Sequence, residues 1–267
     1  MTNLVSDALF EEVWRAFQEQ IKSDEDAADA LYQAMVESNQ TICGCALSQI
    51  SHDQGERFYT CNACRKDVWL TSGTLLDGVV RLRAWMAAIF FNDYGVAVSA
   101  ARLARLVQVA SSTALNIHKK LAMVVCEEMP EADTVSSYWF SPVIFKRSRQ
   151  TPAECHPREE VLSSVQDDFG EQPLDLALEH VVTEYVMAPV DVKLAVSQFV
   201  GLISHEFHGI SRKCLQLYLA SYWCIFDRVR WGPGVLLRAC LRHTPISYEQ
   251  VLNFVSAPRV MIMLPCT

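Results

Sequence analysis

The feature that most constrains this chain is a pair of closely spaced cysteine motifs. Cys43-Gly44-Cys45 and Cys61-Asn62-Ala63-Cys64 are separated by 15 residues. Zn²⁺ prefers four soft ligands in a tetrahedron, and two cysteine-bearing turns joined by a hairpin can supply them. We therefore predict a structural zinc ion held by Cys43, Cys45, Cys61 and Cys64. Metal binding would also supply folding free energy to a segment of about 35 residues that has little core of its own.

The spacing leaves alternatives to this four-cysteine site. The first motif is one residue shorter than the usual C-x-x-C knuckle. The four thiols could be free, or three of them could bind the metal with His52 as the fourth ligand. A catalytic zinc is not expected, because nothing nearby suggests an open coordination position beside a general base. The other cysteines are expected at core positions: Cys126, Cys155, Cys214, Cys224, Cys240 and Cys266.

Composition and hydropathy indicate a globular chain. Of the 267 residues, 51% are hydrophobic and 20% are charged, so the chain can bury a core and is not expected to be disordered. No apolar run reaches the roughly 18 residues that a membrane span needs. The N-terminal residues lack the basic-then-apolar order of a secretory signal. We expect a cytoplasmic, nucleoid-associated protein with no membrane partner.

Charge is strongly segregated along the sequence. The net charge of −8 argues weakly against a nucleic-acid partner, but the charge is unevenly distributed. Residues 57–120 carry +6 and residues 192–267 carry +5, whereas residues 1–56 carry −9 and residues 121–191 carry −10. Phosphate contacts need Lys and Arg only where the DNA backbone passes, so the basic block fits a local DNA footprint. The alternative is that like charges cluster by chance on solvated helices.

Hydrophobic spacing predicts a mainly α fold with a small β zinc ribbon, a helix-turn-helix domain and a C-terminal helical module. Apolar residues at helical spacing begin near Leu9, and strand-like segments occur at 57–60 and 68–70. Further helices are expected at 191–203, 211–229 and 247–255. The expected domains are N-terminal helices at 1–39, the ribbon at 40–78, the helix-turn-helix at 79–129, an acidic degenerate or linker region at 130–190, and the helical module at 191–267. Within the acidic region, 143–145 is a possible strand, 146–172 a loop and 174–186 a possible helix.

Residues 99–120 have helix-turn-helix spacing. A short helix over 99–107, a turn at 108–110 and a second capped helix from Ser111 would place the second helix in the major groove. Asn116 is the best candidate for a base contact, by a bidentate bond to adenine, whereas Ser, Thr and Lys mostly bind phosphates. The alternative is an ordinary αα-hairpin with a polar outer face. The expected DNA-binding residues are Arg65, Lys66, Arg102, Ser111, Ser112, Thr113, Asn116, Lys119 and Lys120.

Taken together, these segments resemble bacterial insertion-sequence transposases, in which an N-terminal zinc ribbon precedes a DDE nuclease domain. The most specific similarity is a His-Gly-x-Ser-x-Lys run followed by a Leu-Gln-x-Tyr-Leu helix at 208–220. The other matching segments are 23–31, the four cysteines, 69–74, 82–85 and 99–120. The resemblance implies a zinc ribbon, a DNA-binding helix pair and three carboxylates that hold two metal ions on an RNase H-like sheet.

The chain departs from that family in its catalytic middle. About 78 residues separate 130 from 208, which is too few for the usual sheet. Asp133 lies where the first carboxylate is expected, and Asp191 is a possible relic of the last. The middle carboxylate has no candidate, because Asp167-Asp168 lies in a loop-like acidic run. Since two-metal chemistry needs the complete triad, we expect no catalytic residues and no enzyme activity.

Two further clusters have simpler interpretations. His205 and His208 lie three residues apart but lack a further ligand, so a polar helix end is expected there. A basic face next to Trp223 and Trp231 could contact DNA or a protein partner, or it could cover a helical core. That face consists of Arg228, Arg230 and Arg238.

Three functions follow from these observations. The first is a transposase-derived, catalytically inactive protein that binds double-stranded DNA, as a repressor or as a recruiting subunit of a nucleoprotein complex. The second is a protein-interaction subunit with a repurposed ribbon, which the acidic segments favour. The third is a compact active DDE-type transposase or nuclease. A homo-oligomer is possible in each case.

Overall fold

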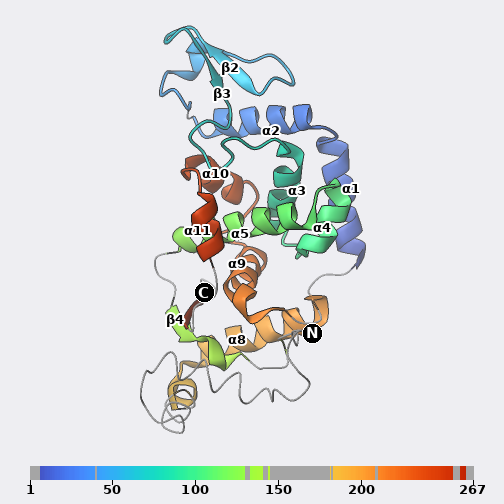
Figure 1. Ribbon diagram of the computed structural model, residues 1–267, viewed down its shortest axis with the longest axis vertical. Coiled ribbons are helices and arrows are strands. Elements are labelled where there is room, and N and C mark those ends of the chain that lie inside the picture. The colour runs from blue at the N-terminus through green and yellow to red at the C-terminus, as the bar shows by residue number, and fades with distance from the viewer. Residues whose placement is uncertain are drawn as a thin grey trace. The chain divides into compact units, whose positions relative to one another are not determined.

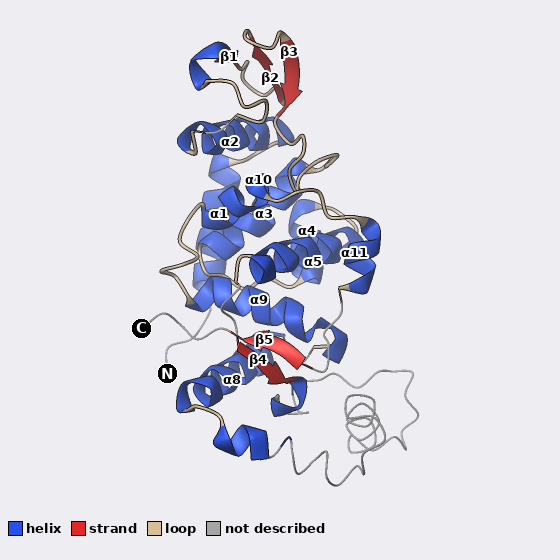
Figure 2. Ribbon diagram, turned by 90° about the vertical axis from the view of Figure 1, so that its left-hand side faces the viewer, coloured by secondary structure: helices blue, strands red, loops and turns tan. Residues whose placement is uncertain are grey.

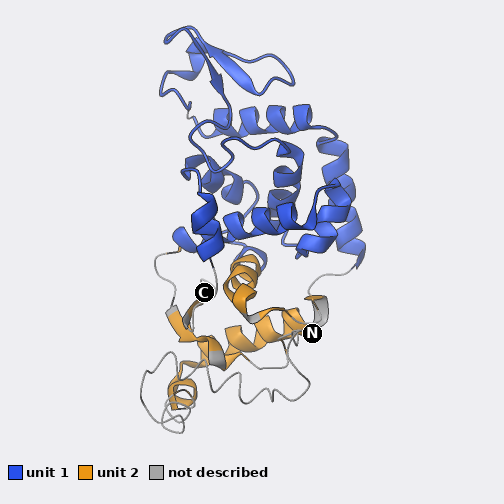
Figure 3. Ribbon diagram, in the orientation of Figure 1, with its two compact units in different colours: residues 1–128, 224–254 blue, residues 129–223, 255–267 orange. Residues whose placement is uncertain are grey.

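The computed structural model is mainly helical and contains two small antiparallel sheets (Figures 1 and 2). Its chain divides into two compact units (Figure 3). Unit 1 consists of residues 1–128 and 224–254, and unit 2 of residues 129–223 and 255–267. The structure describes residues 7–39, 41–129, 133–140, 144, 181, 183–207, 210–254 and 259–262.

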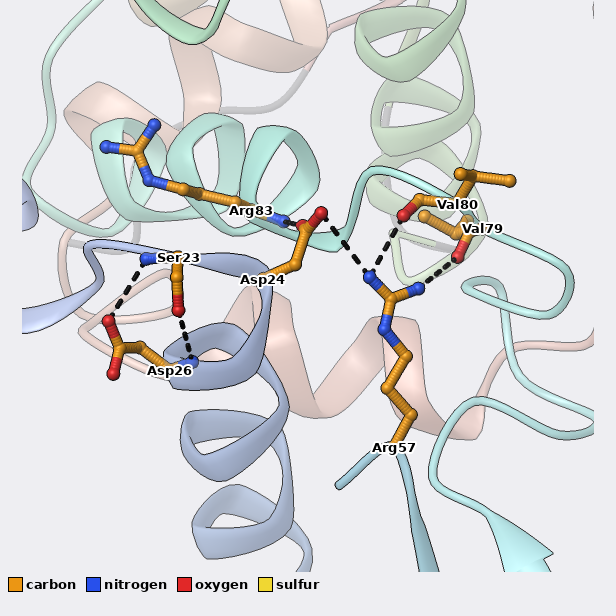
Figure 4. A network of polar contacts seen from close by, with 7 residues as sticks. All are labelled: Ser23, Asp24, Asp26, Arg57, Val79, Val80 and Arg83. Atoms are coloured by element: carbon orange, nitrogen blue, oxygen red, sulfur yellow. Dashed lines mark hydrogen bonds and ion pairs between the residues drawn. The ribbon is translucent and has the colours of Figure 1, made fainter. Parts of the chain in front are cut away.

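Unit 1 begins with the two helices that the apolar spacing predicts. Helix α1 spans Asp7–Gln20 and α2 spans Asp24–Glu37. Ser23 and Asp26 form a reciprocal capping box at the start of α2. The Asp26 backbone N–H donates to Ser23 Oγ at 3.2 Å, and the Ser23 N–H donates to Asp26 Oδ2 at 3.0 Å (Figure 4). This box explains why the chain restarts a helix only three residues after α1 ends.

Helix α3, Leu82–Asp93, lies at the centre of unit 1. Nine of its twelve residues are buried, as expected for a helix whose middle, from Ala84 to Phe91, is apolar all round. Phe91 stacks on Phe10 of α1 with ring centroids 5.1 Å apart, and Phe90 meets Phe17 edge to face at 5.4 Å. Helices α2, α4 (Ala100–Val107), α5 (Ser111–Glu127) and α10 (Val235–Arg242) also pack against α3, so the core of unit 1 forms around this helix.

The expected helix pair is present as α4, Ala100–Val107, and α5, Ser111–Glu127. Ser99 caps α4 by accepting the Arg102 N–H at 3.2 Å, and Gln108 ends it with a left-handed backbone, φ 54°. The prediction of a side-chain cap on α5 is wrong, because the capping position holds Ala110. The geometry is that of two packed helices joined by a three-residue turn.

Residues 224–254 return to unit 1, so the expected module at 191–267 is divided between the two units. Helices α10, Val235–Arg242, and α11, Tyr248–Asn253, pack against the earlier helices, and α11 begins with a capping box at Ser247. Arg228 is half-buried and donates to the backbone carbonyls of Asn92 and Cys224 at 3.0 and 2.8 Å, and to that of Asp93. Arg228 therefore holds the end of α3 instead of contributing to an exposed basic face.

Unit 2 is built around a two-stranded antiparallel sheet and the helices beside it. Strand β4, Asp133–Ser136, pairs with β5, Arg259–Ile262, and Val135 lies opposite Val260. Gln216 ties the helix α9 to β5, because its amide accepts the Met261 N–H at 2.9 Å and donates to the Met261 carbonyl at 3.3 Å. The remaining elements are η2 Ser137–Trp139, α8 Val190–Leu202, the π-helix η4 Ile203–Phe207, η5 Arg212–Cys214 and α9 Leu215–Phe226.

The acidic region is described only in part. Residues 183–187 are helical, which agrees with the end of the helix expected at 174–186. The possible strand at 143–145, apart from residue 144, and the loop expected at 146–172 lie outside the described residues, as do Asp167 and Asp168.

Candidate metal centre and nucleic-acid interface

The cysteine motifs lie in the turns of a three-stranded antiparallel sheet, which the strand-like segments predict. Its strands are β1 Ile50–Ser51, β2 Phe58–Cys61 and β3 Lys66–Trp69, with β2 in the centre. The first motif precedes β1, and the second begins at the end of β2. Alternate residues face opposite sides of a strand. Tyr59 and Cys61 are buried, whereas Thr60 is exposed. The buried Cys61 thiol therefore points to the same side of β2 as Tyr59, where the turns that carry the other three thiols lie.

Two residues with positive φ shape the cysteine-bearing turns. Gly44, between Cys43 and Cys45, has φ +74°, a conformation that side chains rarely adopt. Arg65 follows Cys64 with φ +57°, and its N–H donates to the Cys61 carbonyl at 2.7 Å. Gly44 therefore lets the shorter C-x-C motif turn both of its thiols toward the same point.

The four predicted ligands come together. The Sγ atoms of Cys43, Cys45, Cys61 and Cys64 all lie within 4.8 Å of one another. Zn–S bonds of about 2.3 Å in a tetrahedron would place the sulfurs about 3.8 Å apart, so the cluster can close on an ion with small side-chain movements. Among the described residues, these four cysteines form the one group of three or more His, Cys, Asp or Glu side chains close enough together to hold a metal ion.

Hydrogen bonds around the cluster orient its first motif. The Cys43 N–H donates to the Tyr59 hydroxyl at 3.0 Å, and the Thr41 hydroxyl donates to the Cys45 carbonyl at 2.5 Å. Tyr59 is fully buried, so it is a fixed acceptor. Such partners hold ligand-bearing turns in place before a metal arrives.

The thiols do not ionise alike. Burial raises the pKa of Cys43, but hydrogen bonds from Tyr59, the Cys45 backbone and Thr41 outweigh it and lower the pKa to about 6. Hydrogen bonds to Cys61 and Cys43 raise the pKa of Cys45 to about 12, and the hydrogen bond to Cys61 raises the pKa of Cys64. A metal that takes all four sulfurs as thiolates must therefore displace protons.

His52 lies outside the cluster. Its ring stacks on Tyr32 with centroids 4.1 Å apart, and its Nε2 lies 2.8 Å from the Glu56 carbonyl oxygen. The alternative with His52 as a ligand therefore has no support in this geometry. Of the other six cysteines, Cys224 and Cys240 are buried as expected, Cys126 and Cys214 are half-buried, and Cys155 and Cys266 lie outside the described residues.

A polar network that the sequence interpretation missed fastens the ribbon to the helices (Figure 4). The Arg57 guanidinium lies 3.4 Å from the Asp24 carboxylate and donates to the carbonyls of Val79 and Val80 at 3.3 and 3.0 Å. Asp24 also accepts the Arg83 N–H at 2.6 Å. Each of these partners is remote in sequence, so no local pattern reveals the network.

The expected DNA-binding residues divide into exposed and half-buried groups. Ser111, Ser112 and Thr113 are exposed at the start of α5, and Arg65 and Lys66 are exposed on the ribbon. The half-buried residues are Arg102, Asn116, Lys119 and Lys120.

Arg102 and Lys120 are the residues whose environment differs most from an exposed DNA-binding surface. The Arg102 guanidinium lies over the Phe10 ring, 3.2 Å from its centroid, and 3.7 Å from the Asp7 carboxylate. It thus joins α4 to α1. Burial lowers the pKa of Lys120. Arg105, which the sequence interpretation did not select, is exposed in the last turn of α4.

These residues do not form one continuous patch. In Figures 1 and 2, helices α2 and α3 lie between the ribbon and the α4–α5 pair. Any DNA contact therefore belongs to the ribbon surface or to the helix-pair surface of unit 1, or to both separately.

The candidate carboxylates and histidines of unit 2 lie on separate elements. Asp133 is the first residue of β4, and Asp191 lies in the first turn of α8. His205 lies in the π-helix η4, and His208 is outside the described residues.

Comparison with known proteins does not assign the chain to a family. No protein-family model matches the chain, and no curated protein or solved structure is significantly similar to it. The resemblance to ribbon-bearing transposases therefore stays a prediction. In the part of the chain that the structure describes, every helix is too short or too polar to cross a membrane.

Proposed function

We propose that this protein binds double-stranded DNA without cutting it, as a transposase-derived repressor or recruiting subunit. The observation that carries the proposal is the start of α5. Ser111, Ser112 and Thr113 expose three hydroxyls there, and Ala110 offers no side-chain acceptor to the first N–H groups of a 17-residue helix. Free N–H groups and the positive end of the helix dipole suit a phosphate oxygen.

Charge supports the same surface. Helix α4 and the first ten residues of α5 lie within residues 57–120, which carry +6, whereas the rest of the chain carries a net −14. Arg105 of α4 adds an exposed cation, whereas Arg102 and Lys120 support the packing of the helices. We assign the phosphate contacts to the α5 start and Arg105, and keep Asn116 as the candidate for a base contact.

The metal of the ribbon is Zn²⁺ in this proposal. Four sulfur ligands in a closed tetrahedral set favour Zn²⁺ and leave no position for a substrate. The ion would therefore be structural, holding the ribbon in shape.

A salt titration tests the proposal. Binding of the zinc-loaded protein to a random-sequence duplex, measured by fluorescence anisotropy, should weaken steeply between roughly 50 and 200 mM salt. Thr113→Glu, which adds a negative charge at the α5 start, should reduce the affinity at least tenfold. Gln33→Glu, with the same charge change on the exposed face of α2, is the matched control. No binding at micromolar protein, or equal affinity of the two variants, would reject the proposal.

A protein-interaction role is the second candidate, favoured by α11. Tyr248 and Leu252 lie one turn apart, with 75% and 54% of their surfaces exposed. Two large apolar side chains on one helix face suit a second copy of the chain. Sedimentation that shows a dimer in the wild type and a monomer in Leu252→Glu would support this role, and a monomeric wild type would remove it.

A further inference from the structure

The outer face of the ribbon carries an exposed tryptophan. Trp69 has 57% of its surface exposed, whereas Trp14, Trp85, Trp223 and Trp231 are at most 9% exposed. The sixth, Trp139, is half-buried. An exposed indole leaves a large apolar surface in contact with water. An exposed tryptophan therefore indicates a binding residue more strongly than a single exposed aliphatic side chain does.

The indole is held in place by the sheet. Trp69 lies opposite Phe58 in the β2–β3 register, and their rings meet edge to face with centroids 6.2 Å apart at 62°. Because the Trp69 ring already packs against Phe58, it loses little conformational freedom when a ligand stacks on it. The face beside the aromatic pair is polar, since the Thr60 hydroxyl donates to Asp67 at 2.7 Å.

Exposed cations lie at the start of the same strand. Arg65 and Lys66 are exposed at the start of β3, and within the described residues neither has an ion-pair partner. Lys66 lies about 10 Å along the strand from Trp69 and, being opposite Cys61, starts from the other side of the sheet. A phosphate would therefore meet these cations at the end of the hairpin. The acidic neighbour, Asp67, already accepts the Thr60 hydrogen bond.

An exposed aromatic platform on a hairpin that ends in exposed cations suits unpaired nucleotides. One base needs a single π-face for stacking, and its phosphate needs a nearby cation. A protein partner would need a wider apolar centre than one aromatic pair set among Ser51, Thr60 and Asp67. Bases in a duplex are stacked on each other and cannot cover the indole. We propose that Trp69 and Phe58 form a binding site for single-stranded nucleic acid, separate from the α5 surface.

The exposure of Trp69 provides a direct readout. Oligo(dT) of roughly twelve nucleotides, within the site sizes of single-strand binders, is titrated into the full-length zinc-loaded protein while tryptophan emission is recorded. We expect emission to fall on binding and the accessible indole to become protected from acrylamide. Trp69→Ala should weaken binding about tenfold or more, and Trp69→Phe should retain most of the affinity because a phenyl ring still stacks. Tyr94→Ala, which removes an exposed aromatic at the end of α3, should change neither the affinity for oligo(dT) nor the protection of Trp69.

The outcomes separate this site from the proposed duplex binding. Duplex binding without oligo(dT) binding, or oligo(dT) binding that leaves Trp69 accessible and survives Trp69→Ala, would overturn the inference and leave the α5 proposal standing. If oligo(dT) quenches the tryptophan emission of a protein that binds no duplex, the Trp69 site stands and the α5 proposal is rejected.

Discussion

Arg57 of the ribbon is paired with Asp24, the first residue of α2, at 3.4 Å. The two side chains are 31% and 23% exposed, so the pair is partly shielded from water. Because Arg57 also binds the carbonyls of Val79 and Val80, one guanidinium connects the ribbon, α2 and the segment that leads into α3. The ribbon is therefore oriented by a polar contact as well as by apolar packing.

Replacing Arg57 should loosen the ribbon. Arg57→Ala removes one ion pair and two hydrogen bonds and should lower the free energy of unfolding by about 1–2 kcal/mol. Arg57→Lys should recover only part of this, since an ammonium cannot bridge a carboxylate and two carbonyls in the same geometry. Urea denaturation of the zinc-loaded protein measures the effect. Arg15→Ala, exposed on α1, is the control, and an equal loss in both variants would contradict the role of Arg57.

Metal binding should be stoichiometric and should depend on the four cysteines. We expect one Zn²⁺ per chain, released when the thiols are modified and detected with a metal-sensitive dye. Cys61→Ser should bind far less, because it removes the buried ligand, whereas Cys126→Ser, outside the cluster, should keep one ion. Chelation should unfold the ribbon, since metal binding contributes to its folding. An intact ribbon signal in amide hydrogen exchange after chelation would argue against a structural ion.

The parts of the structure that the sequence predicted are those with local signals. The cysteine spacing located the four ligands, and apolar periodicity located α1, α2, α4 and α5, with capping serines at α2 and α4. Helix α10 was not predicted: it has only eight residues and directly follows Gly232-Pro233-Gly234. The pairing of β4 with β5 joins segments about 125 residues apart and has no local signal. Arg102 was assigned to DNA because sequence gives a side chain's charge but not the Phe10 ring that it covers.

Asp93 should make stability fall as the pH rises. Burial raises the pKa of its carboxyl from 3.8 to about 6, although the Gly234 N–H, at 3.0 Å, and two arginines oppose the shift. Between these two values the native state binds more protons than the unfolded state, so stability falls from about pH 4 to 6 and then levels. Asp93→Asn keeps an acceptor for Gly234 and should gain up to about 3 kcal/mol relative to the wild type across this range. A constant difference between the two proteins from pH 4 to 7 would show that Asp93 does not titrate there.

His118 should have the opposite effect. Burial alone lowers its pKa from 6.5 to about 4, and among the described residues its Nε2 has no hydrogen-bond partner. Between these two pKa values the unfolded state binds a proton at His118 and the native state does not. The free energy of unfolding therefore decreases as the pH falls from about 6.5 to 4, by up to about 3 kcal/mol. His118→Leu should remove this loss without harm at pH 7, because no hydrogen bond to Nε2 is broken. Equal acid sensitivity of the variant and the wild type would contradict the assignment.

The contributions of Asp93 and His118 overlap between pH 4 and 6 and have opposite signs. In the wild type they should largely cancel, so the contribution of either residue emerges only when the other is replaced. Relative to the wild type, His118→Leu should show stability falling with rising pH, and Asp93→Asn should show it rising. The double variant should return close to the wild-type profile if the sites are independent, and any remaining difference measures their coupling. Urea denaturation at half-unit steps from pH 4 to 7 measures all four proteins.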